Sequence, residues 1–155
     1  MRFSLWGMPL DQSFVGRTYP PTEPYIVGRE KIREFARAIG ATDAEYHDPA
    51  AARAIGYTDV VAPPTFPVVF TMATSRQIID DPGLGLDYSR VVHGDQRFAY
   101  VRPVVAGDAL ICVNSVDEIL SRGGHDFLTT RTEVTTEAGE PVLTVWSKLV
   151  QRGEE

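Results

Sequence analysis

The stretch Thr65–Ile79, TFPVVFTMATSRQII, decides the fold, because it is a helix-length segment that is apolar on nearly every side. Thr65 belongs to the residue types that cap helix N-termini, and hydrophobic side chains follow it at positions 66, 68, 69, 70, 72 and 73. A helix that is apolar all round is buried inside a domain. We therefore predict a helix over residues 66–79 that the rest of the chain encloses.

After this segment the sequence changes to the period-two pattern of β-strands. Alternating or β-branched runs cover residues 97–101, 110–116, 127–134 and 141–150, and such runs are typical of strands. Gly107-Asp108, Gly123-Gly124 and Ala138-Gly139 interrupt them at about hairpin spacing,. The pattern predicts an α+β domain in which an antiparallel meander wraps around the apolar helix.

Before the apolar segment, a short strand is expected to end near residue 27, and two helices follow it. Residues 29–39 place Ile32, Phe35, Ala36 and Ile39 on one helical face,. Gly40 then provides a left-handed helix stop. Asp48-Pro49 is an N-cap and first-turn signature, which predicts a second, short helix over residues 50–55.

Length and composition indicate one globular domain over residues 1–155. The chain has 155 residues, of which 43% are hydrophobic and 23% charged, as in ordinary globular proteins. No apolar run is long enough to span a bilayer, and Met1–Leu10 lacks the features of a signal peptide,. We expect a cytoplasmic protein without membrane association.

The charged residues and the metal-ligand residue types exclude two further classes. The net charge of −6 repels a nucleic-acid backbone,, so we expect no nucleic-acid partner. Cys112 is the single cysteine and is expected to be a buried small hydrophobe,. The three histidines have no Cys or His at ligand spacing, which argues against a metal site.

Several motifs together resemble the MaoC-like hydratase/dehydratase family. They are REKIREFARAIG, Tyr46-His47-Asp48-Pro49, Gly56-Tyr57, Ala62-Pro63-Pro64-Thr65-Phe66, HGDQRF from His93 and RPVVAGD from Arg102. The resemblance covers the core of the domain, about residues 10–150. It is strongest to the actinobacterial N-terminal-type branch, which includes acyl-binding subunits of (3R)-hydroxyacyl-ACP dehydratases. The resemblance implies a hot-dog fold, pairing with a second hot-dog subunit as homodimer or heterodimer, an acyl-ACP or acyl-CoA substrate, and no metal or redox cofactor.

The loop that carries the family's hydratase motif departs from the pattern. The motif is Gly-Asp-x-Asn-Pro-x-His, and its acid and imidazole exchange protons with one water. With Gly40 as the register, Ala41 occupies the aspartate position and Asp43 the asparagine position, while His47 lies one residue beyond the histidine position.

Two interpretations of this loop follow. In one, Asp43 and His47 form a displaced catalytic pair, and the chain is a self-sufficient homodimeric hydratase. In the other, which we favour, the motif is degenerate and the chain supplies the acyl-binding half of a complex. A third possibility is a non-catalytic protein that holds an acyl or polyketide group.

The resemblance also points to residues around the substrate. Those expected to contact it are Pro63, Pro64, Thr65, Phe66, Phe70, His93 and Gly94. Each has a structural alternative: Pro63–Phe66 as a rigid helix lead-in capped by Thr65, Phe70 as core, and His93 as a satisfied strand histidine.

Overall fold

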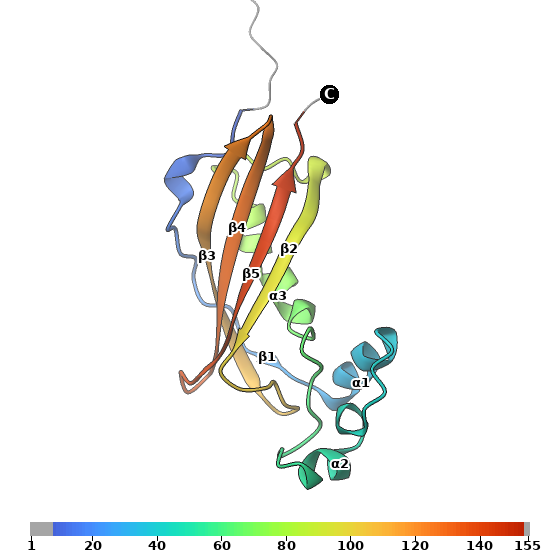
Figure 1. Cartoon of the computed structure of the whole chain (residues 1–155). Coiled ribbons are helices and arrows are strands. Elements are labelled where there is room, and N and C mark those ends of the chain that lie inside the picture. Colours follow the sequence, from blue (N-terminus) through green and yellow to red (C-terminus); the bar gives the residue numbers. More distant parts are fainter. Residues whose placement is uncertain (1–7, 154–155) are drawn as a thin grey trace, which may run out of the picture.

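The computed structural model describes residues 8–153 and consists of one curved antiparallel sheet around short helices (Figure 1). The strands are β1 (Tyr25–Ile26), β2 (Val91–Tyr100), β3 (Ala109–Arg122), β4 (His125–Thr136) and β5 (Pro141–Gln151). The α-helices are α1 (Arg29–Ala38), α2 (Pro49–Ala54), α3 (Val68–Thr74) and α4 (Arg76–Ile79). Short 3₁₀ turns are η1 (Gln12–Phe14), η2 (Ala44–Tyr46) and η3 (Tyr88–Arg90). The predicted α+β hot-dog architecture is confirmed.

The strand order is β1-β3-β4-β5-β2, with every pair antiparallel. Strands β3, β4 and β5 form the predicted meander, but β2 pairs with β5 and not with its sequence neighbour β3. The turn at Gly107-Asp108 is therefore not a hairpin, and this part of the prediction was wrong. The connection crosses the end of the sheet, where Asp108 accepts two hydrogen bonds of 2.9 Å from the Arg102 guanidinium.

The central helix is shorter and less enclosed than the sequence predicts. Helix α3 begins at Val68 after Pro67, and Thr65 makes no side-chain cap. The helix is interrupted at Ser75, where the Ser75 and Thr74 hydroxyls donate to the Met72 and Thr71 carbonyls. Such back-bonding bends helices. Met72 is 61% exposed, so one side of α3 remains uncovered.

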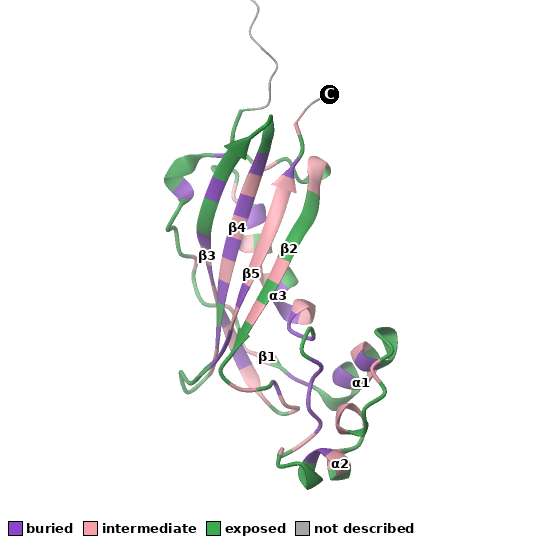
Figure 2. Cartoon of the chain, in the orientation of Figure 1, coloured by how far each residue is buried: buried purple, intermediate pink, exposed green. Residues whose placement is uncertain are grey.

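The core lies between the concave face of the sheet and these helices. Phe66, Ile32 and Leu110 are fully buried in its larger cluster, and the alternation of buried and partly exposed residues along β3 and β4 follows the pleat (Figure 2),. Cys112 is 1% exposed, as predicted. Its burial raises the pKa of the thiol to about 11, which keeps it protonated.

The two long edges of the sheet differ. The β3 edge is covered by the segment before β1: the backbone N–H groups of Gly16, Tyr19 and Thr22 donate to β3 carbonyls at 2.8 to 3.0 Å. Strand β2 has β5 on one side only, and most of its residues are exposed (Figure 2). Within residues 8–153, β2 is thus the long strand with an open edge.

Helices α1 and α2 form a lobe, residues 29–60, beyond one end of the sheet (Figure 1). The predicted local signals are confirmed there. Gly40 has φ of 71° after α1, and the Asp48 carboxylate accepts the Ala50 N–H at 2.9 Å at the start of α2. None of the helices in residues 8–153 is long and apolar enough to cross a membrane.

Candidate functional site

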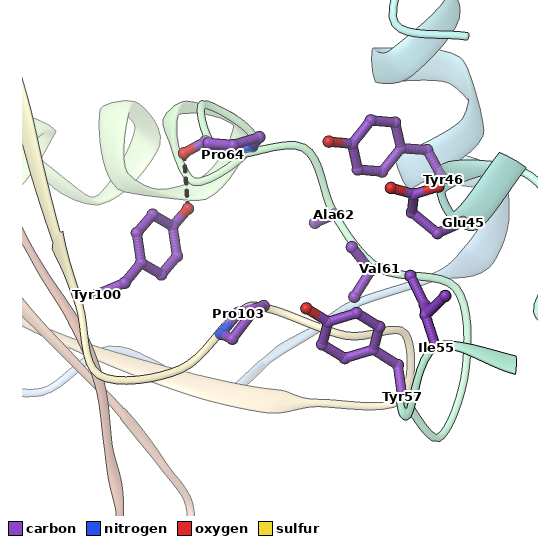
Figure 3. A pocket seen from close by; sticks show the side chains of 9 residues that line it. All are labelled: Glu45, Tyr46, Ile55, Tyr57, Val61, Ala62, Pro64, Tyr100 and Pro103. Carbon is purple, nitrogen blue, oxygen red and sulfur yellow. Dashed lines mark hydrogen bonds between the residues drawn. The ribbon is translucent and has the colours of Figure 1, made fainter. Parts of the chain in front are cut away.

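A cavity of about 350 Å³ lies where the helical lobe meets the sheet (Figure 3). Its lining comes from three segments: the lobe gives Glu45, Tyr46, Ile55 and Tyr57, the run before the central helix gives Val61, Ala62 and Pro64, and the end of β2 with the following turn gives Tyr100 and Pro103. Two backbone hydrogen bonds link these segments. The Val61 N–H donates to the Glu45 carbonyl at 3.0 Å, and the Ala62 N–H donates to the Val104 carbonyl at 2.9 Å.

One wall of the cavity is fixed by a hydrogen bond between distant segments. The Tyr100 phenol donates to the Pro64 carbonyl at 2.7 Å (Figure 3). Partial burial raises the pKa of Tyr100 above its ordinary value, so the phenol remains a donor at neutral pH. This bond ties the end of β2 to the turn that leads into α3.

The polar part of the cavity is formed by oxygen atoms from the lobe. Figure 3 shows the Glu45 carboxylate and the Tyr46 hydroxyl close together on one side of the cavity, and the Tyr57 hydroxyl on another side, beside Pro103. Burial, and then the neighbouring Glu45 carboxylate, raise the pKa of the Tyr46 phenol. A protonated phenol can donate and accept a hydrogen bond, whereas an ionised carboxylate only accepts.

His47, a predicted catalytic residue, faces its own loop. Its Nε2 lies 2.8 Å from the Ala41 carbonyl oxygen, and because a carbonyl only accepts, Nε2 carries the proton. The His47 carbonyl in turn accepts the Arg33 Nε–H at 2.8 Å. These contacts close the loop between α1 and α2, and His47 is absent from the cavity lining.

Asp43, the other predicted catalytic residue, precedes η2 and is exposed. Its side chain makes no cap hydrogen bond, and no bond joins it to His47 among the hydrogen bonds of residues 8–153. The structure therefore does not bring Asp43 and His47 together as a bonded pair. Their catalytic role stays a prediction.

Of the predicted substrate-binding residues, Pro64 lines this cavity. Phe66 and Phe70 lie in the core, with ring centroids 6.4 Å apart. Pro63, directly before Pro64, is buried, and Thr65 is exposed.

His93 and Gly94 lie near the other end of β2, where His93 Nε2 is 2.9 Å from the Gln96 amide oxygen. Their contact with a substrate likewise stays a prediction.

Sequence reasoning missed the polar residues of the cavity, Glu45, Tyr46 and Tyr57. A signal for one of them was present: with Gly40 as the register, Tyr46 stands at the motif's histidine position and Glu45 directly before it. The histidine position of the motif is thus occupied by a tyrosine whose side chain lines the cavity. No group of His, Cys, Asp and Glu side chains in residues 8–153 has the arrangement of a metal site.

The comparisons with known proteins identify the family and the fold of this chain. Residues 13–145 match the model of the FAS1-like dehydratase domain region. A UPF0336 protein of Streptomyces avermitilis is 59% identical over 96% of this chain and 99% of its own length.

Two solved structures are similar in both fold and sequence. One is the C-terminally truncated HadBC complex, a (3R)-hydroxyacyl-ACP dehydratase of Mycobacterium tuberculosis. The matched chain of that complex has a TM-score of 0.78 and 32% sequence identity, and the match covers 88% of this chain and 96% of the matched chain. The other is a MaoC-like dehydratase with a TM-score of 0.84 and 35% identity, covering 91% of this chain and 43% of that protein. The chain belongs to the MaoC-like hot-dog hydratase/dehydratase family, in its FAS1-like dehydratase-domain branch, together with the UPF0336 proteins.

Proposed function

We propose that this chain is the acyl-binding subunit of a (3R)-hydroxyacyl-thioester dehydratase, and that a second hot-dog subunit carries the catalytic pair. The proposal rests on the loop between α1 and α2, where the catalytic motif residues are replaced although the neighbouring cavity is present. The motif positions for acid and imidazole hold Ala41 and Tyr46, and His47 is engaged with a backbone carbonyl. The cavity beside them is nevertheless formed.

The chemistry of dehydration supports an incomplete site. Loss of water from a 3-hydroxyacyl thioester requires a base for the α-proton and an acid for the departing hydroxyl. The Ala41 methyl group can do neither, and a phenol whose pKa is raised is a weak acid at neutral pH. The two motif positions thus supply no acid/base pair, which favours the binding of an acyl group over the removal of water from it.

The similar HadBC structure is a complex, which supports a paired arrangement for this chain. The open edge of β2 and the uncovered side of α3 offer the surface for it. Gln96 of β2 and Met72 of α3 lie together beside a shallow groove on this flank. A second sheet can satisfy the open backbone groups of β2 while it covers Met72.

Reconstitution tests the proposed division of labour. The chain is co-expressed with a hot-dog protein that carries an intact Gly-Asp-x-Asn-Pro-x-His motif, such as one encoded beside it, and the purified complex is assayed for hydration of a crotonyl thioester. We expect turnover by the complex and its loss when the partner's motif histidine is replaced by alanine. Turnover that survives this replacement contradicts the proposal.

A variant of the β2–α3 flank tests the interface. Met72→Glu places a charge on the side chain expected to be covered, and we expect the complex to dissociate in size-exclusion chromatography. Leu120→Glu is the matched control, because Leu120 is 48% exposed near the end of β3 and away from β2. Equal behaviour of the two variants argues against this interface.

A further inference from the structure

Three oxygen-bearing side-chain groups line the cavity. The Glu45 carboxylate and the Tyr46 and Tyr57 hydroxyls form no hydrogen bond with another residue of the described part of the chain, whereas the Tyr100 hydroxyl is bonded to Pro64. All three come from the lobe; Glu45 and Tyr46 lie close together, and Tyr57 borders the cavity on another side, beside Pro103 (Figure 3). The arrangement is that of a small polar subsite.

The rest of the lining is apolar. It consists of Ile55, Val61, Ala62, Pro64 and Pro103, apart from the ring of Tyr100. Apolar walls with a few converging polar groups are the usual composition of a small-molecule site, and such sites have volumes of roughly 300 to 1,000 Å³. The cavity of about 350 Å³ is at the lower end of this range and fits a short acyl group.

The donor and acceptor pattern selects the ligand chemistry. A carboxylate accepts a hydrogen bond, and a protonated phenol donates one, so the pair complements a group that does both. A hydroxyl group does both. An ammonium ion offers no acceptor to the phenols, and a carboxylate or phosphate is repelled by Glu45.

We propose that Glu45 and Tyr46, assisted by Tyr57, form a hydroxyl-recognition subsite that makes this chain select short 3-hydroxyacyl groups over the corresponding saturated acyl groups. The inference rests on the proposed acyl-binding function and adds the residues that determine specificity. The Glu45 carboxylate accepts the ligand's hydroxyl proton, and the Tyr46 phenol donates to the ligand's hydroxyl oxygen. The residue at the histidine position of the motif thus contributes to binding of the hydroxyl group and takes no part in proton transfer.

Calorimetric binding to the purified full-length chain tests the subsite. The probes are the pantetheine thioesters of (3R)-hydroxybutyrate and butyrate, which differ by one hydroxyl. Because hydrogen bonds to charged groups are the stronger ones, we expect the hydroxylated probe to bind about tenfold more tightly. Tyr46→Phe and Glu45→Gln should each lower this ratio severalfold. Tyr88→Phe is the control, because Tyr88 is 53% exposed in η3 and outside this cavity.

Each outcome distinguishes the two proposals. Equal affinity for both probes, or a ratio that both variants leave unchanged, overturns the hydroxyl subsite while the acyl-binding function stands. If neither probe binds, both proposals are contradicted. If the variants lower the affinity for both probes equally, Glu45 and Tyr46 shape the cavity and the specificity assignment is wrong.

Discussion

The sheet with its central helix and the helical lobe are held together by different forces. In the first region, Phe66, Leu110 and Leu128 are fully buried, and the hydrophobic effect acts over two packed clusters of buried side chains,. In the lobe, Ile32 and Phe35 of α1 reach the larger cluster. The Phe35 ring packs edge-on against the Phe66 ring, with the ring centroids 5.6 Å apart. Within residues 41–57, Ala52 alone is buried, and this segment is held by single hydrogen bonds such as those made by His47 and Asp48.

The difference explains where specificity can change in this fold. A substitution in the core disturbs many packed side chains at once. A substitution in the segment 41–57 alters one or two polar contacts beside the cavity. The hydratase motif belongs to this second region, so Ala41 and Tyr46 could replace its acid and imidazole without loss of the fold.

The largest expected effect comes from truncating the core. Phe66→Ala removes a fully buried ring and should lower the free energy of unfolding by about 3–5 kcal/mol, because a cavity is left in a packed interior. Chemical denaturation measures the change. Ile55→Ala is the comparison, since Ile55 is 59% exposed on the cavity rim and should change stability by about 0.5 kcal/mol or less. Similar losses for both would remove the distinction between the two regions.

A smaller and local effect is expected from the cap of α2. Asp48→Ala removes the acceptor for the Ala50 N–H, and loss of such a cap costs about 1 kcal/mol. Hydrogen exchange should show faster exchange in residues 41–56, with protection in β3, β4 and β5 unchanged. Uniformly faster exchange through the sheet would mean that the lobe and the core unfold as one unit.

The smallest expected effect is a pH dependence in the lobe. The Asp59 carboxylate accepts two hydrogen bonds from the Arg29 guanidinium, at 2.8 and 2.6 Å. These bonds lower the pKa of Asp59 from 3.8 to about 2. A carboxyl with a depressed pKa stabilises the fold above its unfolded pKa, and this contribution is lost as the pH falls from about 4 to about 2.

Asp59→Asn removes this dependence. Its free energy of unfolding should lie below that of the wild type at pH 6, and the two values should converge toward pH 2. Denaturation at a series of pH values measures the difference. A constant difference across the whole series would show that the ionisation of Asp59 is not its cause.

Sequence patterns predicted the parts of the structure that local chemistry determines. The spacing of Ile32, Phe35 and Ala36 identified α1, and Asp48-Pro49 located the start of α2. The pairing of β2 with β5 was missed because period-two patterns identify strands without identifying their partners. The interruption at Ser75 was missed because hydroxyl back-bonding has no strong sequence signature.

The candidate site could be predicted only in part. The family motif identified its loop. Within that loop, Asp43 and His47 were predicted to be catalytic because carboxylates and imidazoles are the usual proton-transfer groups. The cavity combines Glu45 with Pro103, residues that the fold brings together from distant parts of the chain. The direction of the His47 ring depends on one bond to Ala41, which no spacing rule reveals.

The central claim is that this chain binds an acyl thioester and lacks the catalytic pair. The most direct test is hydration of a crotonyl thioester by the purified chain alone, with Asp43→Asn and His47→Ala measured beside the wild type. We predict no turnover above the uncatalysed rate for all three. Robust turnover by the wild type that disappears in both variants would contradict the account, because Asp43 and His47 would then be the working acid/base pair.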